Sequence, residues 1–441
     1  MLLRTMALAA VALAAGAAIC PNPPVPALSP RAPADVCIPD PFNALTLNFF
    51  DDYSWRMFTA MVWPAAHNQR GGADTARGIG GSGARVFETF KSLWEVFHDD
   101  GSAPTAAFNA YDPPSANTCR AATRFGDVVL AASTPYGDIG QAGIGELTGP
   151  LVAQNGRYVR YQTLYNQVAY DYIVRNRYYL RDRLPPIPSP RPDVPVMQFP
   201  VGSIVVKAAW LDVRGLPKAL LSRLYKRPAT VRDPDTGACS SATVALIGLH
   251  IVQKTATRPQ WIWSSFEQAD TAPLFAGIVG DYLLNDGSPT PMPEENPIPL
   301  VPLPKQPAKP FNVVRNSATS IHPNTHAANS AWRDLLKGTV WRNYQLIVTQ
   351  WPLQPGNQAL PVPVANTGDI YNTFPGTGPG ATSDSAFANL TMETFDQRRV
   401  ELGCMSCHNR ARLAADFLWS VLDHAYPAKI APAPAAVRAA R

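Results

Sequence analysis

The sequence is short of charged residues and contains no run of basic ones. Charged side chains make up 16% of the 441 residues, and 38 basic against 33 acidic residues leave a net charge of +5. Nucleic-acid-binding proteins usually concentrate basic residues on one face, so we expect no nucleic acid among the partners. Together with a hydrophobic content of 46%, the low charge also excludes a disordered chain and a coiled coil.

Long hydrophobic runs are scarce as well. After the first twenty residues, no stretch reaches the roughly 18 uninterrupted apolar residues that a membrane helix requires, so we predict no transmembrane helix. Residues 1–18 combine Arg4 with an apolar run and then small residues, which is typical of a secretory signal peptide. A lipoprotein signal at Cys20 is disfavoured because Ile19 occupies a position that normally takes a small residue. We therefore predict a periplasmic or otherwise exported protein.

The sequence also lacks the common enzyme motifs. It contains no G-x-S-x-G, H-E-x-x-H or P-loop pattern. Catalytic residues are therefore not identified, and the sequence leaves open whether the protein is an enzyme.

Proline, in contrast, is abundant, with 45 residues. This is about twice the usual share, and it predicts many loops because proline interrupts helices and central strands alike. Two dense stretches, near residues 185–200 and 291–310, are predicted to be extended connectors. We predict a large α+β domain over residues 19–360, a C-terminal segment over residues 361–426 and a mobile tail over residues 427–441.

Hydrophobic periodicity predicts an α+β class, with helices around an antiparallel or mixed β-sheet and a helical C-terminal segment. Turn residues at 257–260 predict that the second and third of the expected strands form an antiparallel hairpin. Helices are expected over residues 55–62, 86–97, 161–172, 387–395 and 410–425, and strands over residues 203–210, 243–254, 261–266 and 341–351.

The one motif with a specific chemistry is C-x-x-C-H at Cys404, Cys407 and His408, the attachment signature of c-type haem. On a helical turn, residues three and four apart share a face, so both thiols can bond one porphyrin edge while His408 reaches the iron. We therefore predict one covalent haem c, held by Cys404 and Cys407, with His408 as an axial iron ligand.

Other roles for the two thiols have less support. A redox C-x-x-C is expected near a βαβ pattern, and a zinc site needs a second pair of ligands; neither is found near residue 404. A disulfide between the two thiols would be strained. The remaining cysteines, Cys20, Cys37, Cys119 and Cys239, are predicted to form two disulfides, and the sequence does not choose among the three possible pairings.

Through its haem motif, the chain resembles a group of exported bacterial proteins of the cytochrome c family. The resemblance also rests on the segments WRMFTAMVWPA, ARVFETFKSLWEVF, GLHIVQKT, WIWSSFEQ, TVWRNYQLIVTQWP and LTMETFDQ. It implies a large non-haem portion followed by a single C-terminal haem site, and it leaves the substrate open.

The second axial ligand must come from upstream of the motif or be water or absent, because the 33 residues after His408 contain no methionine. His250, in a predicted strand, and Met392 are the candidate distal ligands, although either side chain could simply be packed or satisfied. Arg399 and Arg410 flank the motif and are candidate partners for the haem propionates, with a solvated helix face as the alternative.

Three functions fit these features. The first is electron transfer by an exported mono-haem c-type cytochrome to or from a redox partner protein. The alternative is a haem-dependent enzyme or small-ligand sensor whose distal pocket comes from the upstream domain. A third is a binding module in which ten tryptophans form a surface for a partner. We adopt electron transfer as the working hypothesis because no catalytic constellation is recognisable.

Overall fold

The protein is described from a computed structural model. Several features predicted above lie outside the described residues: the signal peptide, most of both proline-rich connectors, Arg399, Cys404, Cys407, Arg410 and the C-terminal tail. The described residues are 20–21, 23–37, 46–131, 138–140, 150–185, 197–234, 236–274, 278–287, 306–315, 321–351, 389–395, 408 and 411–427.

Eight strands of the described chain form one mixed sheet, and the class is α+β as predicted. Its central strand, β6, has 15 residues, long enough to pair with β5 through its first half and with β7 through its second half. β4 runs along the other edge of β6, β3 and β1 follow beyond it, and β8 pairs with β7. All pairs are antiparallel except β2 with β5. The strands are β1 (Lys91–Ser92), β2 (Val128–Leu130), β3 (Val159–Tyr165), β4 (Ile204–Asp212), β5 (Lys226–Arg232), β6 (Cys239–Gln253), β7 (Ile262–Gln268) and β8 (Tyr344–Gln350).

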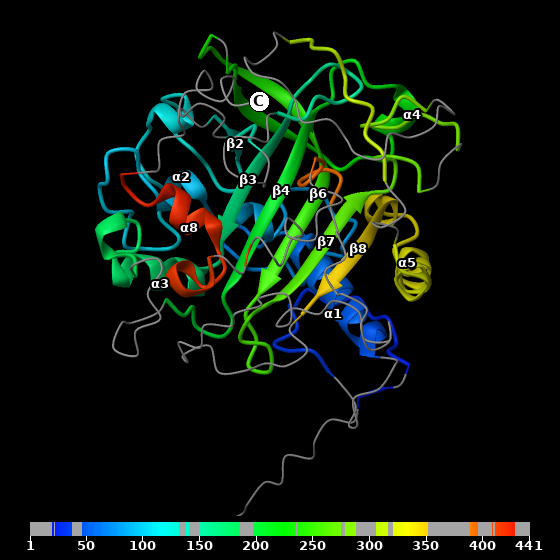
Figure 1. Cartoon of the computed structure of the whole chain (residues 1–441), viewed down its shortest axis with the longest axis horizontal. Coiled ribbons are helices and arrows are strands. Elements are labelled where there is room, and N and C mark those ends of the chain that lie inside the picture. Colours follow the sequence, from blue (N-terminus) through cyan, green and yellow to red (C-terminus); the bar gives the residue numbers. More distant parts are fainter. Residues whose placement is uncertain are drawn as a thin grey trace, which may run out of the picture.

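Helices cover the sheet, and α1 lies behind it in Figure 1. Trp55 and Phe58 of α1 pack against Phe266 of β7, and Ser54 hydrogen-bonds Ser264 at 2.8 Å. The apolar i, i+3 spacing therefore buries one face of α1 on the sheet. The helices are α1 (Thr46–Met61), α2 (Leu93–Val96), α3 (Gln167–Asn176), α4 (Lys218–Leu221), α5 (Pro323–Leu335), α7 (Arg412–Ala415) and α8 (Trp419–His424), with 3-10 turns η1 (Phe87–Thr89), η2 (Ala116–Thr118), η4 (Arg181–Arg183) and η6 (Val340–Asn343).

The four predicted strands are confirmed as β4, β6, β7 and β8, and the predicted hairpin as the pairing of β6 with β7. The helix predicted over residues 161–172 is wrong in its first half, which is β3. Alternate side chains of a half-buried strand can also match helical spacing over a few residues. Asn166 then caps α3, accepting a hydrogen bond from the Ala169 backbone nitrogen at 3.1 Å. The helix predicted over residues 86–97 is divided into η1, β1 and α2.

The C-terminal helix predicted over residues 410–425 is interrupted. Asp416 and Phe417 have φ angles of 47° and 74°, in the left-handed region, and they separate α7 from α8. The described part of the helix expected over residues 387–395 is a series of turns. In Figure 1, the orange segment 389–395 crosses in front of β4 and β6, and α8, in red, lies beside β3.

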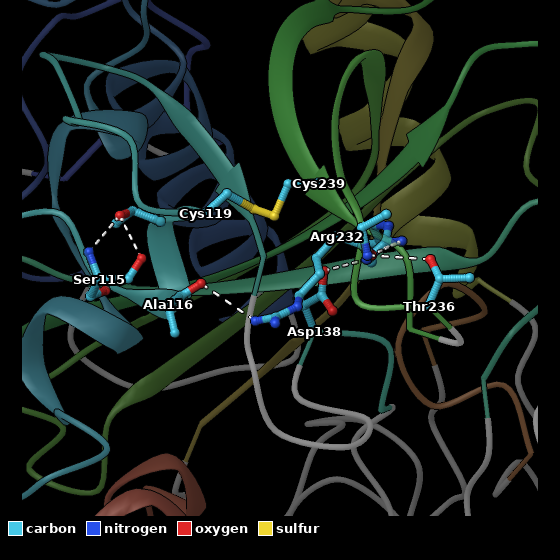
Figure 2. Close-up of a disulfide and its surroundings, with 10 residues drawn as sticks. Ser115, Ala116, Cys119, Asp138, Arg232, Thr236 and Cys239 are labelled. Atoms are coloured by element: carbon cyan, nitrogen blue, oxygen red, sulfur yellow. Dashed lines mark hydrogen bonds and ion pairs between the residues drawn. A yellow bond between two sulfur atoms is a disulfide. The ribbon is translucent and has the colours of Figure 1, made fainter.

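The four cysteines form two disulfides, and these correspond to one of the three pairings that the sequence left open. Cys20 pairs with Cys37, so the sulfur of Cys20 is not free for a lipid. Cys119 pairs with Cys239 at the start of β6 and joins chain segments 120 residues apart (Figure 2). Arg232 bridges the same region, donating a hydrogen bond to the Ala116 carbonyl at 3.4 Å. Disulfides of this kind are typical of oxidising compartments.

No helix in the described part of the chain is both long enough and apolar enough to cross a membrane.

Candidate functional site

A row of polar side chains crosses the face of the sheet that lies opposite α1. Lys207 of β4 pairs with His250 of β6, and His250 pairs with Ser265 of β7. Directly paired residues of antiparallel strands project from the same face, so the three side chains are neighbours. Apolar clusters lie on this face on both sides of the row, and a polar group buried there is costly unless it has a partner.

His250 is held by one of its two ring nitrogens. Its Nδ1 lies 2.7 Å from the Ser265 hydroxyl, and the side chain is only 9% exposed. No described residue hydrogen-bonds Nε2. Burial, followed by the nearby charges of His408 and Lys207, lowers the pKa of His250 to about 3, so the imidazole is neutral at pH 7.

His408, the histidine of the haem motif, lies over the same face. Its ring centroid is 4.5 Å from that of Trp263, and the ring of His250 is 6.1 Å from the same indole. The two imidazoles are therefore within about 11 Å of each other although 158 residues separate them. Burial lowers the pKa of His408 to about 4, and Lys207 acts in the same direction.

The tautomer of His408 follows from its hydrogen bond. Nδ1 lies 2.6 Å from the backbone carbonyl oxygen of Phe417. A carbonyl oxygen only accepts, so Nδ1 carries the proton and Nε2 the lone pair. Nε2 has no hydrogen-bond partner within the described residues. The imidazole is thus oriented, neutral and free at the nitrogen that can bind a metal.

The break between α7 and α8 makes this hydrogen bond possible. In a straight helix, nine residues span about 14 Å, too far for the Phe417 carbonyl to reach His408. The left-handed backbone at Asp416 and Phe417 turns the chain back instead. Neither residue is a glycine, so surrounding contacts must hold the conformation.

Those contacts come from the sheet and the loop before it. The Asp416 carboxylate accepts hydrogen bonds from Lys254 Nζ at 2.5 Å and from the Phe199 backbone nitrogen at 2.8 Å. Trp261 Nε1 donates to the Asp416 carbonyl at 3.1 Å. Both members of the Lys254–Asp416 ion pair are at most 5% exposed in their side chains. We call this arrangement the Asp416 latch, because it fixes the residue that precedes the partner of His408.

A second set of contacts docks segment 389–395. Glu267 of β7, fully buried, forms an ion pair with Arg315 and accepts a hydrogen bond from the Leu390 backbone nitrogen at 2.5 Å. A Cβ atom at Gly248 of β6 would lie 1.9 Å from the Thr391 hydroxyl, so only glycine permits this approach.

The structure brings two of the predicted site residues close together and places a third elsewhere. His250 and His408 come together, whereas Met392 is fully buried in the apolar cluster that includes Leu390 and Phe395. The roles predicted for Cys404, Cys407, Arg399 and Arg410 fall on residues outside the described part. Lys207 was not predicted, although its position within the β-branched run SIVVKAAW was a usable signal.

Comparisons with protein-family models, with curated proteins and with solved structures found no match for this chain. Within the described residues, no group of three or more His, Cys, Asp or Glu side chains could hold a metal ion. The functional argument therefore rests on the two imidazoles, the haem motif and the side chains around them.

Proposed function

We propose that this protein is an exported mono-haem c-type cytochrome that transfers electrons through haem covalently bound to Cys404 and Cys407. His408 is the proximal iron ligand. The supporting observation is the His408 tautomer: Nδ1 donates to the Phe417 carbonyl, and Nε2 keeps its lone pair with no partner among the described residues. A metal-bound histidine typically donates its other ring N–H in this way, to a backbone carbonyl or carboxylate.

His250 is the sixth ligand in this proposal. It is neutral at physiological pH, its Nδ1 is engaged by Ser265 and its Nε2 has no partner in the described chain. Binding of the iron by both histidines would suit an electron carrier, because it would leave no position on the metal open for a substrate. Met392, in contrast, is fully buried among apolar side chains, which favours a packing role.

The haem-dependent enzyme or small-ligand sensor remains the second candidate. The observation in its favour is Lys207, a cationic group that lies next to His250 in the sheet. A lysine and an unligated histidine together could bind a small ligand on the distal side. The two candidates differ in whether His250 binds iron.

Absorption spectra of the purified protein, oxidised and reduced, with and without carbon monoxide, test both the cofactor and its ligation. We expect a low-spin spectrum that carbon monoxide leaves unchanged. Binding of carbon monoxide to the wild-type protein would favour the enzyme or sensor. Haem-stained denaturing gels of wild type and of the Cys404→Ala/Cys407→Ala variant test attachment, and equal staining of the two would refute it.

Two histidine variants locate the sixth ligand. His250→Ala should bind carbon monoxide. His424→Ala is the matched control, because burial lowers the pKa of His424 as well, to about 4, but its ring packs near Phe97. An identical response of the two variants would rule out His250 as the ligand.

A further inference from the structure

Lys207 is unusual among the lysines of this protein. Three lysines of the described chain are buried or half-buried, namely Lys91, Lys207 and Lys254. Lys91 donates hydrogen bonds to Glu95 and to the Ala110 carbonyl, and Lys254 pairs with Asp416. Lys207 has neither a hydrogen bond nor an ion pair with any described residue. Among the described residues, its ammonium group has no paired carboxylate of the kind that Lys91 and Lys254 have.

The surroundings of Lys207 disfavour its charged form on balance, and two weaker influences act in the opposite direction. Its Nζ lies 4.8 Å from the centre of the Tyr161 ring, a cation–π contact. Burial lowers the pKa of Lys207, and the opposing influence is Glu393, which lies beyond ion-pair distance. Glu393 accepts a hydrogen bond from the Asn389 backbone nitrogen at 3.1 Å.

The other ionisable neighbours of Lys207 that the structure describes include two histidines. His250 is the direct partner of Lys207 in the β4–β6 pair, and the charge of Lys207 lowers the pKa of both His250 and His408. His250 is about nine-tenths buried and keeps Nε2 without a described partner on the same face. A half-buried ammonium beside two such imidazoles is an environment that favours an anion.

We propose that Lys207 binds a carboxylate on this face of the sheet, one strand spacing from His250. The carboxylate has two possible sources. A propionate of the haem would make Lys207 part of the cofactor site, and this source rests on the proposed function. A free small carboxylate would make it a separate ligand site, independent of haem.

The test compares the purified protein with Lys207→Met, which removes the charge at similar volume, and Lys207→Arg, which keeps it. For a propionate partner, Lys207→Met should lower the haem midpoint potential and make it pH-dependent between about pH 5 and 8, because the unpaired propionate then takes up a proton on reduction. Lys207→Arg should behave as wild type. Haem staining reports separately whether the proposed cofactor is present.

For a free carboxylate, sodium acetate should raise the melting temperature of the wild type relative to sodium chloride at equal ionic strength. Lys207→Met should lose this shift, and Lys207→Arg should retain it. A protein without covalent haem that still shows the acetate effect would refute the proposed function but not the carboxylate site. The site is refuted if folded Lys207→Met, checked by circular dichroism, matches wild type in both measurements.

Discussion

Replacing Asp416 by asparagine tests whether the Asp416 latch holds the C-terminal segment and orients His408. Asparagine is nearly the same size as aspartate and tolerates the left-handed backbone found at this position, so the substitution mainly removes the charge. Its side-chain oxygen can still accept the hydrogen bond from Phe199. The substitution thus removes the carboxylate that forms an ion pair with Lys254, which is 4% exposed.

The magnitude follows from this burial. Removing one partner of a buried ion pair typically costs about 3–5 kcal/mol, because the other charge stays buried and uncompensated. We expect the free energy of unfolding of Asp416→Asn to fall by about this amount, as measured by urea denaturation. The exposed pair Asp334–Lys337 supplies the control: Asp334→Asn should change the free energy by less than about 1 kcal/mol.

The second expected effect is on His408. If the latch loosens, the Phe417 carbonyl moves away from Nδ1 and the His408 imidazole loses its orienting hydrogen bond. Loss of such a bond commonly weakens metal binding about 10- to 100-fold. Absorption spectra of the haem-loaded Asp416→Asn protein should therefore show altered ligation. An unfolding free energy within about 1 kcal/mol of wild type, together with an unchanged spectrum, would refute the reasoning.

Three further predictions concern the framework of the fold. The Cys119→Ala/Cys239→Ala variant should lose about 4–5 kcal/mol of stability under oxidising conditions, since that disulfide closes a loop of about 120 residues. Gly248→Ala should cost about 1–3 kcal/mol through its clash with Thr391, measured by thermal unfolding. Burial raises the pKa of Asp51 from 3.8 to about 7, so the folded state binds a proton that the unfolded state releases between these values. The wild type should therefore lose stability relative to Asp51→Asn as the pH rises from 4 to 7, and the difference should be constant above pH 7.

Each of these three predictions has a control or a contrary outcome that can be measured in the same protein. Removing the Cys20–Cys37 disulfide should cost less, about 3 kcal/mol, because its loop is 17 residues long; the reverse order would contradict the loop-length argument. Gly78→Ala should be close to neutral, since nothing lies within 4 Å of its Cβ position. A pH-independent difference between wild type and Asp51→Asn would show that Asp51 does not titrate in this range.

The strands of the sheet could be predicted because their local and tertiary preferences agree. β4 and β7 are β-branched or aromatic runs bounded by proline or glycine, and they are buried on both faces. The segment 161–172 was ambiguous, because a strand followed directly by a helix produced apolar spacing that resembles one helix. In such cases the tertiary environment decides, and the sequence alone does not reveal it.

The break between α7 and α8 could not have been predicted for a different reason. Glycine or proline usually marks such a turn, but here Asp416 and Phe417 adopt positive φ angles. The conformation is maintained by Lys254 and Trp261, more than 150 residues earlier in the chain. The same turn creates the His408–Phe417 hydrogen bond. The motif therefore identified His408, but the sequence could not predict the orientation of its imidazole.

The size of the upstream domain also has a physical explanation within the proposed function. α7 and α8 contain four and six residues, too few to be stable alone, and their apolar side chains join the core cluster that includes Trp261 and Trp263. The sheet therefore forms the surface on which His408 packs, and it also contains His250. A group bound by both histidines would be contacted by the docked segment and by the sheet at once, so its binding would stabilise the docking. If the protein is an electron carrier as proposed, such coupling would keep the surroundings of the redox centre fixed, and the sheet beside the short C-terminal segment would supply the rigidity.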